Sequence, residues 1–433
     1  MTESRDISIQ VPVLTRVEGE GALELDIHQG RIEALRLRIY EPPRLFEKFL
    51  EGRAPDEVID MVARICGICP AAYQMTAVQA LEALFGVRVD PWVAAMRRVF
   101  YCAEWLQSHA LHIHLLALPD FLGYDVVTGM AQDYPAEVRR GLRLQALGND
   151  LLALFGGRSV HPVGVRVGGF HRAPPPERVA RMRKRLVEAQ QDATDLLRWV
   201  ASLALPEDEQ DFVCVALRHE QAYPLGSGRI VSSEGLDISP AEFGDHFEEF
   251  QVPHSTALHA LLDGRPYLVG PLARVNLNLD RLPEELLALL DECGIRFPSR
   301  NMYHSLLARA AEIWLAVHEA TRLLADYRVP AQSWVQWAPR AGTAVWATEA
   351  PRGLLWHRYE LDNEGRVMSA RIVPPTSQNQ ARIEEDLKTA LEAFGLDREE
   401  AELRHRGETI IRNYDPCISC ATHFLRLRVN RSL

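Results

Sequence analysis

Apolar residues recur along the chain with two different periods. Between residues 7 and 40 they alternate with polar residues in three short runs, which predicts a small antiparallel sheet. The turn His28-Gln-Gly-Arg31 separates two of these runs, and its glycine permits the positive φ angle that such a turn requires. The N-terminal part of the chain is therefore expected to be rich in β-structure.

Long apolar stripes at helical spacing dominate the middle of the chain. We expect one helix over about 92–118, a second after Pro174-Pro-Pro176, and a third from about Leu306 to Leu324. Stripes of this length are typical of a helical bundle core. Between the second and third helices, residues 206–280 contain shorter strand-like pieces and are expected to form a mixed region.

Near the C-terminus, residues 354–373 resemble a hairpin that turns at Asp362-Asn-Glu-Gly365, and a helix over about 378–394 follows. No repeat, low-complexity segment or flexible linker divides the chain. The expected fold class is mainly α with small peripheral β-sheets (α+β), built on a core of long helices.

The amino-acid composition argues against several classes of protein. The 433 residues are 47% hydrophobic and 25% charged, which is ordinary for a soluble globular protein, and the net charge of −11 argues against nucleic-acid or anionic-membrane binding. No apolar stretch is long enough to span a membrane, and the N-terminus lacks the features of a signal peptide. The seven cysteines, an odd and sparse set, fit a reducing compartment. We therefore expect a cytoplasmic protein.

Two cysteine motifs near opposite ends of the chain carry the candidate chemistry. They are Arg64-Ile-Cys-Gly-Ile-Cys-Pro70 and Asp415-Pro-Cys-Ile-Ser-Cys-Ala-Thr-His423, and each contains a C-x-x-C pair. Pro70 suits the first position of a helix, so Cys69 is expected beside a helix N-terminus, whose partial positive charge favours thiolate over thiol. Together the motifs could present four thiolates to one metal site, provided the fold brings the two ends together.

The spacing alone leaves the metal open. Structural zinc, an iron–sulfur cluster, and nickel or another soft metal all accept thiolate ligands. Structural zinc sites usually place their cysteine pairs closer in sequence, which weakens the zinc interpretation.

The residues around the cysteines resemble the two signature motifs of the large subunit of [NiFe]-hydrogenases. Four further segments resemble motifs of that family, in the same order along the chain: Thr15-Arg-Val-Glu-Gly-Glu20, Phe46-Glu-Lys-Phe-Leu-Glu-Gly-Arg53, Gly156-Gly-Arg-Ser-Val-His-Pro162 with Gly168-Gly169, and Glu349-Ala-Pro-Arg-Gly-Leu354. The sequences Cys69-Pro-Ala-Ala-Tyr-Gln74 and Pro374-Pro-Thr-Ser-Gln-Asn379 are most similar to the cytoplasmic branch that couples hydrogen to NAD(P), including the sulfhydrogenases.

The resemblance implies a single large-subunit domain over residues 1–433. Its expected parts are a β-rich N-terminal part (1–60), a helical bundle (61–205 and 281–330), a mixed insertion (206–280) and a C-terminal part that closes the metal site (331–423). Residues 424–433 are expected to be a tail that a maturation endopeptidase removes, and nickel-insertion chaperones are further expected partners.

The same resemblance implies a nickel–iron centre whose iron carries CO and two cyanides. Cys66 and Cys417 would be terminal nickel ligands, and Cys69 and Cys420 would bridge nickel to iron. Glu47 and His423 would bind Mg²⁺ together with a backbone carbonyl near Ile372. Thr376 and Pro375 would approach a cyanide ligand.

Four residues are implied in the reaction itself. Arg352 would lie over the two metals, with Asp415 and Asp120 as neighbouring carboxylates. For Asp120 a cap or turn role after Pro119 stays open. Glu18, which taken alone would be a solvated carboxylate at a strand edge, would relay the proton from the Cys417 thiolate. The sequence departs from the family at Tyr73, because many members have histidine there.

The expected activity is reversible heterolytic cleavage of H2. The chain has no second set of cysteines for iron–sulfur clusters and no G-x-G-x-x-G loop, so electrons would pass through a small subunit with iron–sulfur clusters. Diaphorase-type subunits with FAD and iron–sulfur clusters would then carry them to NAD(P). The alternatives are an H2-sensing regulatory subunit and a structural Zn/Cys4 protein.

Overall fold

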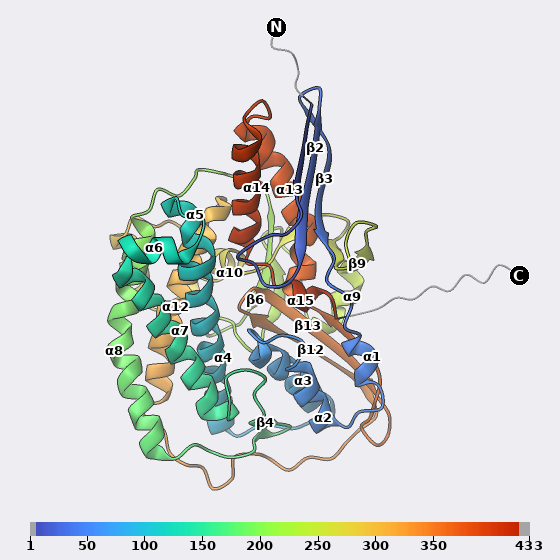
Figure 1. Cartoon of the computed structure of the whole chain (residues 1–433). Coiled ribbons are helices and arrows are strands. Elements are labelled where there is room, and N and C mark those ends of the chain that lie inside the picture. The colour runs from blue at the N-terminus through green and yellow to red at the C-terminus, as the bar shows by residue number, and fades with distance from the viewer. Residues whose placement is uncertain (1–5, 424–433) are drawn as a thin grey trace, which may run out of the picture.

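Long helices form one side of the molecule (Figure 1). The computed structural model describes residues 6–423. Helix α4 (Pro91–Leu111) packs against α7 (Pro135–Gly156) and α12 (Ser305–Leu323), and α12 also packs against α8 (Pro176–Ala201). The three predicted helical stripes correspond to α4, α8 and α12, whose apolar faces are buried. The prediction of a helical bundle is therefore confirmed.

Helix α7 was not predicted, because two glycines interrupt its apolar stripe. One of them, Gly148, lies where α7 meets α4, and a Cβ atom there would be 2.7 Å from the carbonyl oxygen of Ala103. The glycine weakens the helix locally but lets the two backbones approach closely. Packing against α4 thus outweighs the low helix propensity.

Helix α4 continues without a break into a π-helical segment, His112–Ala117, and then into α5 (Leu118–Leu122). The stretch predicted as one helix is therefore helical throughout, but its hydrogen-bond pattern changes near the end. π-Helical turns occur often at functional sites.

Two three-stranded antiparallel sheets lie on the other side of the molecule. β1 (Ile7–Val11), β2 (Gly21–His28) and β3 (Arg31–Ile39) form the predicted N-terminal sheet. The second sheet joins β12 (Gly342–Ala350), β13 (Gly353–Leu361) and β14 (Val367–Val373). The hairpin of β13 and β14 was predicted, whereas β12 was not. Helix α3 (Pro70–Phe85) packs on β12 and β13; it begins at Pro70, as predicted, and ends before Gly86, which has φ of 69°.

Residues 206–280 form a small sheet and a ribbon, in agreement with the predicted mixed region. The sheet has the strand order β11-β6-β7-β8, and the ribbon pairs β9 with β10. These strands are β6 (Val213–Arg218), β7 (Arg229–Ser232), β8 (Asp237–Ile238), β9 (Phe247–Gln251), β10 (Leu258–Leu262) and β11 (Tyr267–Leu268).

The remaining elements are short and connect the larger ones. They are α1 (Phe46–Leu50), α2 (Pro55–Val62), α6 (Val127–Asp133), β4 (Val165–Arg166), β5 (Gly169–Phe170), α9 (Phe243–His246), α10 (Pro271–Asn278), α11 (Glu284–Glu292) and the 3-10 turns Pro240–Glu242, Leu279–Arg281 and Met302–His304.

The C-terminal segment returns to the N-terminal sheet. Helix α13 (Pro375–Phe394) starts three residues earlier than predicted, and α14 (Glu400–Tyr414) was not predicted. The chain then enters the short helix α15 (Ile418–Ala421), where Cys417 pairs with Glu18 as an isolated parallel bridge. This pairing brings the two ends of the chain together. The prediction of a mainly helical fold with small sheets is confirmed.

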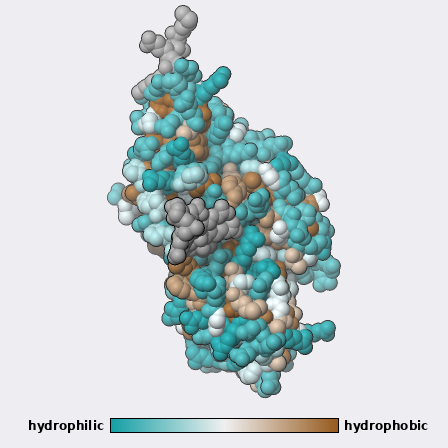
Figure 2. Space-filling view, turned by 90° about the vertical axis from the view of Figure 1, so that its right-hand side faces the viewer, coloured by the Kyte–Doolittle hydropathy of each residue, from teal (hydrophilic) through white to brown (hydrophobic). Residues whose placement is uncertain are grey.

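The surface is mostly hydrophilic on the face shown in Figure 2, with apolar patches between the polar side chains. Some large apolar side chains are exposed, among them Phe49 and Met368. Within residues 6–423, no single helix is long and apolar enough to cross a membrane; one bent pair, Pro91–Leu122 with Val127–Asp133, meets that criterion by length and composition only.

Candidate metal centre

The two cysteine motifs meet in the interior. Their four sulfur atoms all lie within 4.8 Å of one another. Cys66 Sγ is 3.3 Å from Cys417 Sγ, and Cys69 Sγ is 3.5 Å from Cys420 Sγ. All four side chains are buried, and the structure has no disulfide between them. The fold therefore brings together the predicted four-thiol site.

Backbone and side-chain contacts hold the two cysteine loops. Cys69 is the residue before helix α3, and its amide and that of Ile68 both face Cys66 Sγ, at 3.4 and 3.3 Å. Arg44 donates to the carbonyl oxygens of Ile65, at 2.6 Å, and of Ser419. Because these carbonyls belong to different cysteine motifs, Arg44 ties the motifs together. Sequence analysis did not identify this arginine.

The pKa shifts of the cysteines indicate that a cation is needed if more than one of the four thiols is to lose its proton. Hydrogen bonds from the other cysteines, first that from Cys417, lower the pKa of Cys66. Burial is the first cause that raises the pKa of Cys417 and of Cys420. One thiolate is therefore stable here, whereas further deprotonation needs positive charge close to the sulfurs. A metal ion that prefers soft thiolate ligands supplies that charge.

Arg352 is buried and pairs with Asp415, which lies two residues before Cys417. Its Nε donates to the Asp415 carbonyl oxygen at 2.7 Å, and its Nη2 donates to Asp415 Oδ1 at 2.9 Å. Burial lowers the pKa of Arg352, but the charges of Asp415, Cys417 and Cys69 outweigh burial, so the guanidinium stays protonated. Its Nη1 and Asp415 Oδ2 are buried, and no hydrogen-bond partner for either lies among the described residues.

Unusual backbone conformations at Asp415 and at Gly353 hold Asp415 and Arg352 in place. Asp415 ends α14 with φ of 56°, a left-handed conformation that aspartate tolerates better than most residues. Gly353 follows Arg352 with φ of 134°, and a Cβ atom at that position would lie 2.8 Å from the Gly270 nitrogen. The arginine loop therefore packs directly on the backbone of a neighbouring segment.

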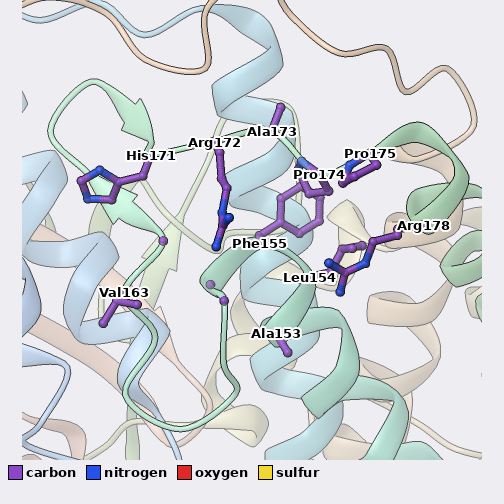
Figure 3. A pocket seen from close by; sticks show the side chains of 13 residues that line it. Ala153, Leu154, Phe155, Val163, His171, Arg172, Ala173, Pro174, Pro175 and Arg178 are labelled. Carbon is purple, nitrogen blue, oxygen red and sulfur yellow. The ribbon is translucent and has the colours of Figure 1, made fainter.

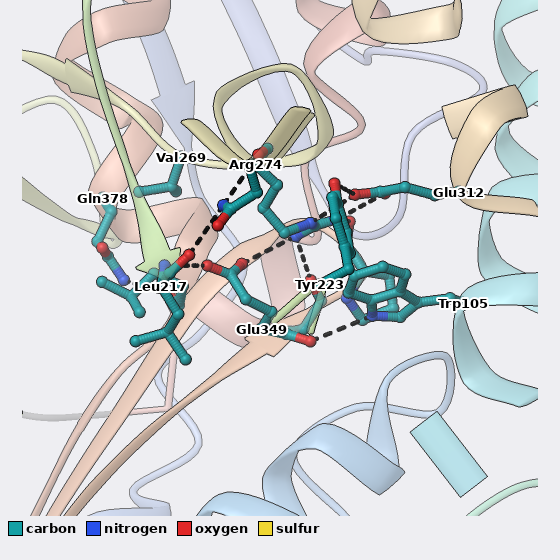
Figure 4. Close-up of polar contacts among 12 residues, drawn as sticks. Trp105, Leu217, Tyr223, Val269, Arg274, Glu312, Glu349 and Gln378 are labelled. Atoms are coloured by element: carbon teal, nitrogen blue, oxygen red, sulfur yellow. Dashed lines mark hydrogen bonds and ion pairs between the residues drawn. The ribbon is translucent and has the colours of Figure 1, made fainter. Parts of the chain in front are cut away.

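A fully buried ion cluster supports the arginine loop (Figure 4). Arg274 pairs with Glu312 at 2.8 Å and with Glu349 at 3.0 Å. It also donates to the carbonyl oxygens of Ala350 and Pro351, at 2.8 and 2.9 Å. These carbonyls directly precede Arg352 in the chain. Arg274 thus fixes the loop, and it was not predicted, because in the sequence it is only an arginine in an apolar segment.

The carboxylates of this cluster differ in charge state. Burial raises the pKa of Glu349 to about 7. Burial also acts to raise that of Glu312, but the charge of Arg274 and its hydrogen bonds outweigh burial and hold the pKa at about 2. Tyr223 donates to Glu312 at 2.7 Å, and Trp105 Nε1 donates to the Glu349 carbonyl oxygen at 3.1 Å.

Glu18 lies against the second cysteine motif. The Ser419 amide donates to Glu18 Oε2 at 3.0 Å, and the Ile418 amide donates to the Glu18 carbonyl oxygen at 3.0 Å. Burial, followed by the negative charge of Cys66, raises the pKa of Glu18. The next residue, Gly19, has φ of 91°, and a Cβ atom there would lie 2.6 Å from Ile418 Cβ. Only glycine lets this strand approach the cysteine loop so closely.

Glu47, His423 and the backbone of Ile372 form a second polar group beside Cys420. The Ile372 amide donates to Glu47 Oε1 at 2.8 Å, and His423 Nε2 lies 2.8 Å from the Ile372 carbonyl oxygen. His423 Nε2 is 3.6 Å from Glu47 Oε1. The structure therefore brings together the three groups predicted to bind Mg²⁺.

Asp120 pairs with Arg412 and Arg16, and not with Arg352, the arginine beside which it was predicted to lie. Its carboxylate accepts from Arg412 Nε at 2.7 Å and from Arg412 Nη2 at 3.0 Å, and it also pairs with Arg16. No contact between Asp120 and Arg352 occurs among the described residues. Arg412 belongs to α14, a helix that the sequence pattern did not reveal, so this partner could not be foreseen.

Thr376 and Pro375 lie at the start of α13. Pro375 is the first residue of the helix, and Thr376 Oγ1 accepts a hydrogen bond from the Cys417 amide at 3.1 Å. Both residues are buried. Thr376 therefore touches the cysteine motif directly, as its predicted position near the metals requires.

Glu104 is a buried carboxylate that sequence analysis missed. It accepts hydrogen bonds from the amides of Ala71, at 2.6 Å, and Ala72, at 3.0 Å, in the first turn of α3. Burial raises its pKa to about 8. Because Cys69 offers that helix no side-chain cap, Glu104 caps it from α4 and so holds the first cysteine motif in place.

His254, His259 and Glu384 form a second cluster of residues of the kinds that bind metals, and these residues hydrogen-bond to one another. Glu384 takes contacts from His254 Nε2 at 2.8 Å, from His259 Nε2 at 3.3 Å and from the Leu37 amide at 2.9 Å. These contacts link α13 to β3 and β10.

A surface cavity of about 470 Å³ lies beside the C-terminal end of α7 (Figure 3). Its wall includes Phe155, Arg172 and Arg178. None of the predicted site residues lines it. The candidate chemistry is therefore in the buried thiol centre and not in this open cavity.

Comparison with known proteins agrees with this geometry. A model of the family described as nickel-dependent hydrogenase matches residues 44–140 and 253–423, which include all four cysteines of the centre. The alpha subunit of sulfhydrogenase 1 from Pyrococcus furiosus is 33% identical over 425 residues, covering 97% of this chain and 99% of that protein. The beta subunit of the NAD-reducing hydrogenase HoxS from Cupriavidus necator is 28% identical, covering 95% of this chain and 94% of that protein.

Solved structures of hydrogenases are also similar to this chain. The crystal structure of an NAD⁺-reducing [NiFe]-hydrogenase in the H2-reduced state is similar with a TM-score of 0.86 and 26% identity, covering 96% of this chain and 99% of the other. A [NiFeSe]-hydrogenase from Dm. baculatum shares the fold with a TM-score of 0.79 at 24% identity, covering 97% of this chain and 100% of the other. The predicted resemblance to hydrogenase large subunits is confirmed.

Proposed function

The chain belongs to the nickel-dependent hydrogenase family, and on that premise we propose that it is the catalytic subunit of a hydrogenase that couples H2 to NAD(P). It would cleave H2 reversibly into protons and electrons and pass the electrons to an iron–sulfur partner. The observation that carries the proposal is the buried four-thiol centre, together with the buried Arg352, whose Nη1 has no hydrogen-bond partner among the described residues.

The donor set fits a nickel–iron centre. Four thiolates are soft ligands suited to nickel and iron, and a metal cation would oppose the burial that raises the pKa of Cys417. We assign Cys66 and Cys417 as terminal nickel ligands and Cys69 and Cys420 as bridging ligands. This division follows from the motif positions of the cysteines, whose sulfurs lie in one cluster with Cys417 Sγ 2.7 Å from Cys420 Sγ. When bound, a nickel–iron centre with CO and two cyanides would supply the position at which hydrogen reacts.

Arg352 would stabilise negative charge that develops during cleavage. Its guanidinium remains protonated, and Asp415 holds two of its nitrogens in place. The third, Nη1, is buried and has no hydrogen-bond partner among the described residues, and it would donate towards the centre. A preorganised cation in a site without water is a strong electrostatic catalyst. Asp120 would act indirectly, because it fixes Arg412 at the end of α14.

Glu18 would accept the proton that leaves through Cys417. Its backbone pairs with Cys417, and its raised pKa brings its proton affinity closer to that of a thiol. Glu47, His423 and the Ile372 carbonyl would bind Mg²⁺ behind the centre. Thr376 and Pro375 would face a cyanide ligand.

Electron transfer would need partner subunits. Beyond the four cysteines of the centre, the chain has Cys102, Cys214 and Cys293, which lie singly and cannot hold an iron–sulfur cluster. The relatives are named as subunits of a sulfhydrogenase and of an NAD-reducing hydrogenase. We therefore propose a small subunit with iron–sulfur clusters, diaphorase-type subunits with FAD, a maturation endopeptidase, nickel-insertion chaperones and a cytoplasmic location.

The test is metal content combined with activity of the complex purified from its own host. We expect nickel, iron in excess of nickel because the partner subunits would carry iron–sulfur clusters, and H2-dependent reduction of NAD⁺ or NADP⁺. Zinc in place of nickel and iron would overturn the proposal in favour of a structural site. Nickel and iron with H2 binding but negligible turnover would favour a sensor.

A further inference from the structure

Two histidines and a glutamate outside the thiol centre converge on one point. One ring nitrogen of His254, one of His259 and a carboxylate oxygen of Glu384 all lie within 4.8 Å of one another. His254 Nε2 is 2.8 Å from Glu384 Oε1, and His259 Nε2 is 3.3 Å from Glu384 Oε2. A tetrahedral zinc ion binds nitrogen and oxygen at about 2.0–2.2 Å, which places neighbouring ligand atoms about 3.3–3.6 Å apart. Small movements of these side chains would therefore bring them to the distances that zinc requires.

Backbone contacts hold the two histidines in position. His259 belongs to β10, and His254 lies in the turn of residues 252–257 that precedes this strand. The Thr256 amide in the same turn donates to the Ile39 carbonyl oxygen at 2.8 Å, which fixes the turn against the end of β3. The two imidazole rings are 5.9 Å apart, centroid to centroid, and nearly perpendicular. They approach the glutamate from different directions, as two ligands of one ion must.

Glu384 is held from its other side by the N-terminal sheet. Its Oε1 accepts a hydrogen bond from the Leu37 amide of β3 at 2.9 Å. Outer contacts of this kind orient the carboxylates that bind metals. The side chain of His259 is only 2% exposed, whereas those of His254 and Glu384 are 21% and 19% exposed. The cluster is thus supported from inside the protein and accessible to solvent on one side.

The donor types favour zinc over the hard cations. Imidazole nitrogens suit zinc, while Mg²⁺ and Ca²⁺ prefer oxygen ligands. The spacing of His254 and His259, with four residues between them, lies within the range found in zinc sites. No fourth residue of a metal-binding kind joins the group in the part of the chain from 6 to 423, so water would take the fourth position.

We propose that His254, His259 and Glu384 bind a zinc ion that ties β10 to α13. The inference goes beyond the proposed function, because this ion would be separate from the nickel–iron centre. Helix α13 also carries Thr376, which accepts a hydrogen bond from the Cys417 amide. Zinc would therefore stabilise the helix that contacts the second cysteine motif. Since an ion bound only by the folded chain stabilises that state, its removal should lower the thermal unfolding midpoint.

The test is elemental analysis of the whole complex after incubation with Zn²⁺ and removal of unbound metal. We expect zinc bound to this chain in addition to nickel. X-ray absorption at the zinc edge should show nitrogen and oxygen at about 2.0 Å and no sulfur, which binds zinc at about 2.3 Å. His259→Gln and Glu384→Gln should each weaken zinc binding by more than about 100-fold, because loss of even an outer contact weakens it by about 10–100-fold.

His246→Gln is the matched control. His246 Nδ1 lies 3.4 Å from Asp263 Oδ1, and among the described residues this pair has no third ligand. The control variant should bind zinc as the unmodified complex does. The inference is overturned if the unmodified complex binds no zinc, if its zinc has sulfur neighbours, or if His246→Gln and His259→Gln lose zinc equally.

A milder variant covers the case in which the buried substitutions prevent folding. His254→Gln changes only a partly exposed ligand in a turn. Zinc should raise the unfolding midpoint of the unmodified complex above its value in chelator, but should leave that of His254→Gln unchanged. An equal rise in both would overturn the inference. Nickel and iron content bears on the proposed function alone, so the two failures are distinguishable.

Discussion

Replacing Arg274 by methionine would remove the cation that holds the arginine loop. Arg274 is fully buried between Glu312 and Glu349, and it also binds the carbonyl oxygens of Ala350 and Pro351. Methionine fills much of the same volume without charge. The substitution therefore isolates the electrostatic role of the side chain from its packing.

The expected loss of stability is large. Removing one partner of a buried ion pair costs about 3–5 kcal/mol, because a charge is left without compensation. Each carbonyl that loses its donor adds about 1 kcal/mol. Arg198→Met is the matched control: Arg198 pairs with Glu292 on the surface, where both side chains are about half exposed. Loss of such a surface pair costs at most about 1 kcal/mol.

The assay is urea unfolding of the purified chain at two pH values. Arg274→Met should lower the midpoint far more than Arg198→Met does. Without Arg274, burial is no longer opposed, so the folded-state pKa of Glu312 rises from about 2 to above its ordinary 4.5, and that of Glu349 rises above about 7. Stability then falls as pH rises, so the deficit should be larger at about pH 8 than at about pH 6. Equal midpoints for the two variants, or a deficit independent of pH, would show that Arg274 does not stabilise the fold through its charge.

Three further predictions concern the centre. Glu18→Gln should leave metal content unchanged but suppress proton exchange with H2, and full exchange activity would reject the relay. Arg352→Lys keeps the charge but loses the paired contacts to Asp415, so activity should fall about 10²-fold with an unchanged metal content. Glu104 has a folded pKa of about 8, above its ordinary 4.5, so it should stabilise the fold at low pH and lose this effect as pH rises through about 8. Glu104→Gln should flatten that decline in urea unfolding, and an unchanged pH profile would contradict the assignment.

Sequence analysis located the parts of the fold that depend on local chemistry. The alternation over 7–40 and the turn at Gly30 correspond to β1–β3, and Pro70 and Gly86 mark the ends of α3. Each of these signals comes from residues near one another in the chain. The cysteine motifs were equally clear, because C-x-x-C spacing has few structural uses other than metal or redox chemistry.

Helices and ion pairs that depend on contacts between residues far apart in the chain were not predicted from the sequence. Helix α7 is stabilised by packing at Gly148, a residue that by itself disfavours a helix. Helix α14 was missed, and with it the ion pair between Arg412 and Asp120. Glu104 and Arg274 lie in apolar segments, where only the folded structure shows what their charges bind. A buried charge and a partner far away in the chain produce no periodic pattern, so a single sequence does not show that they pair.

The central claim is that the four cysteines hold a nickel–iron centre with CO and cyanide ligands. Infrared spectroscopy of the matured complex tests it most directly, because few other groups in a protein absorb in that region. Such a centre should give one CO band and two CN bands that shift when H2 is added and disappear in Cys417→Ser. A spectrum of the active complex without these bands would contradict it.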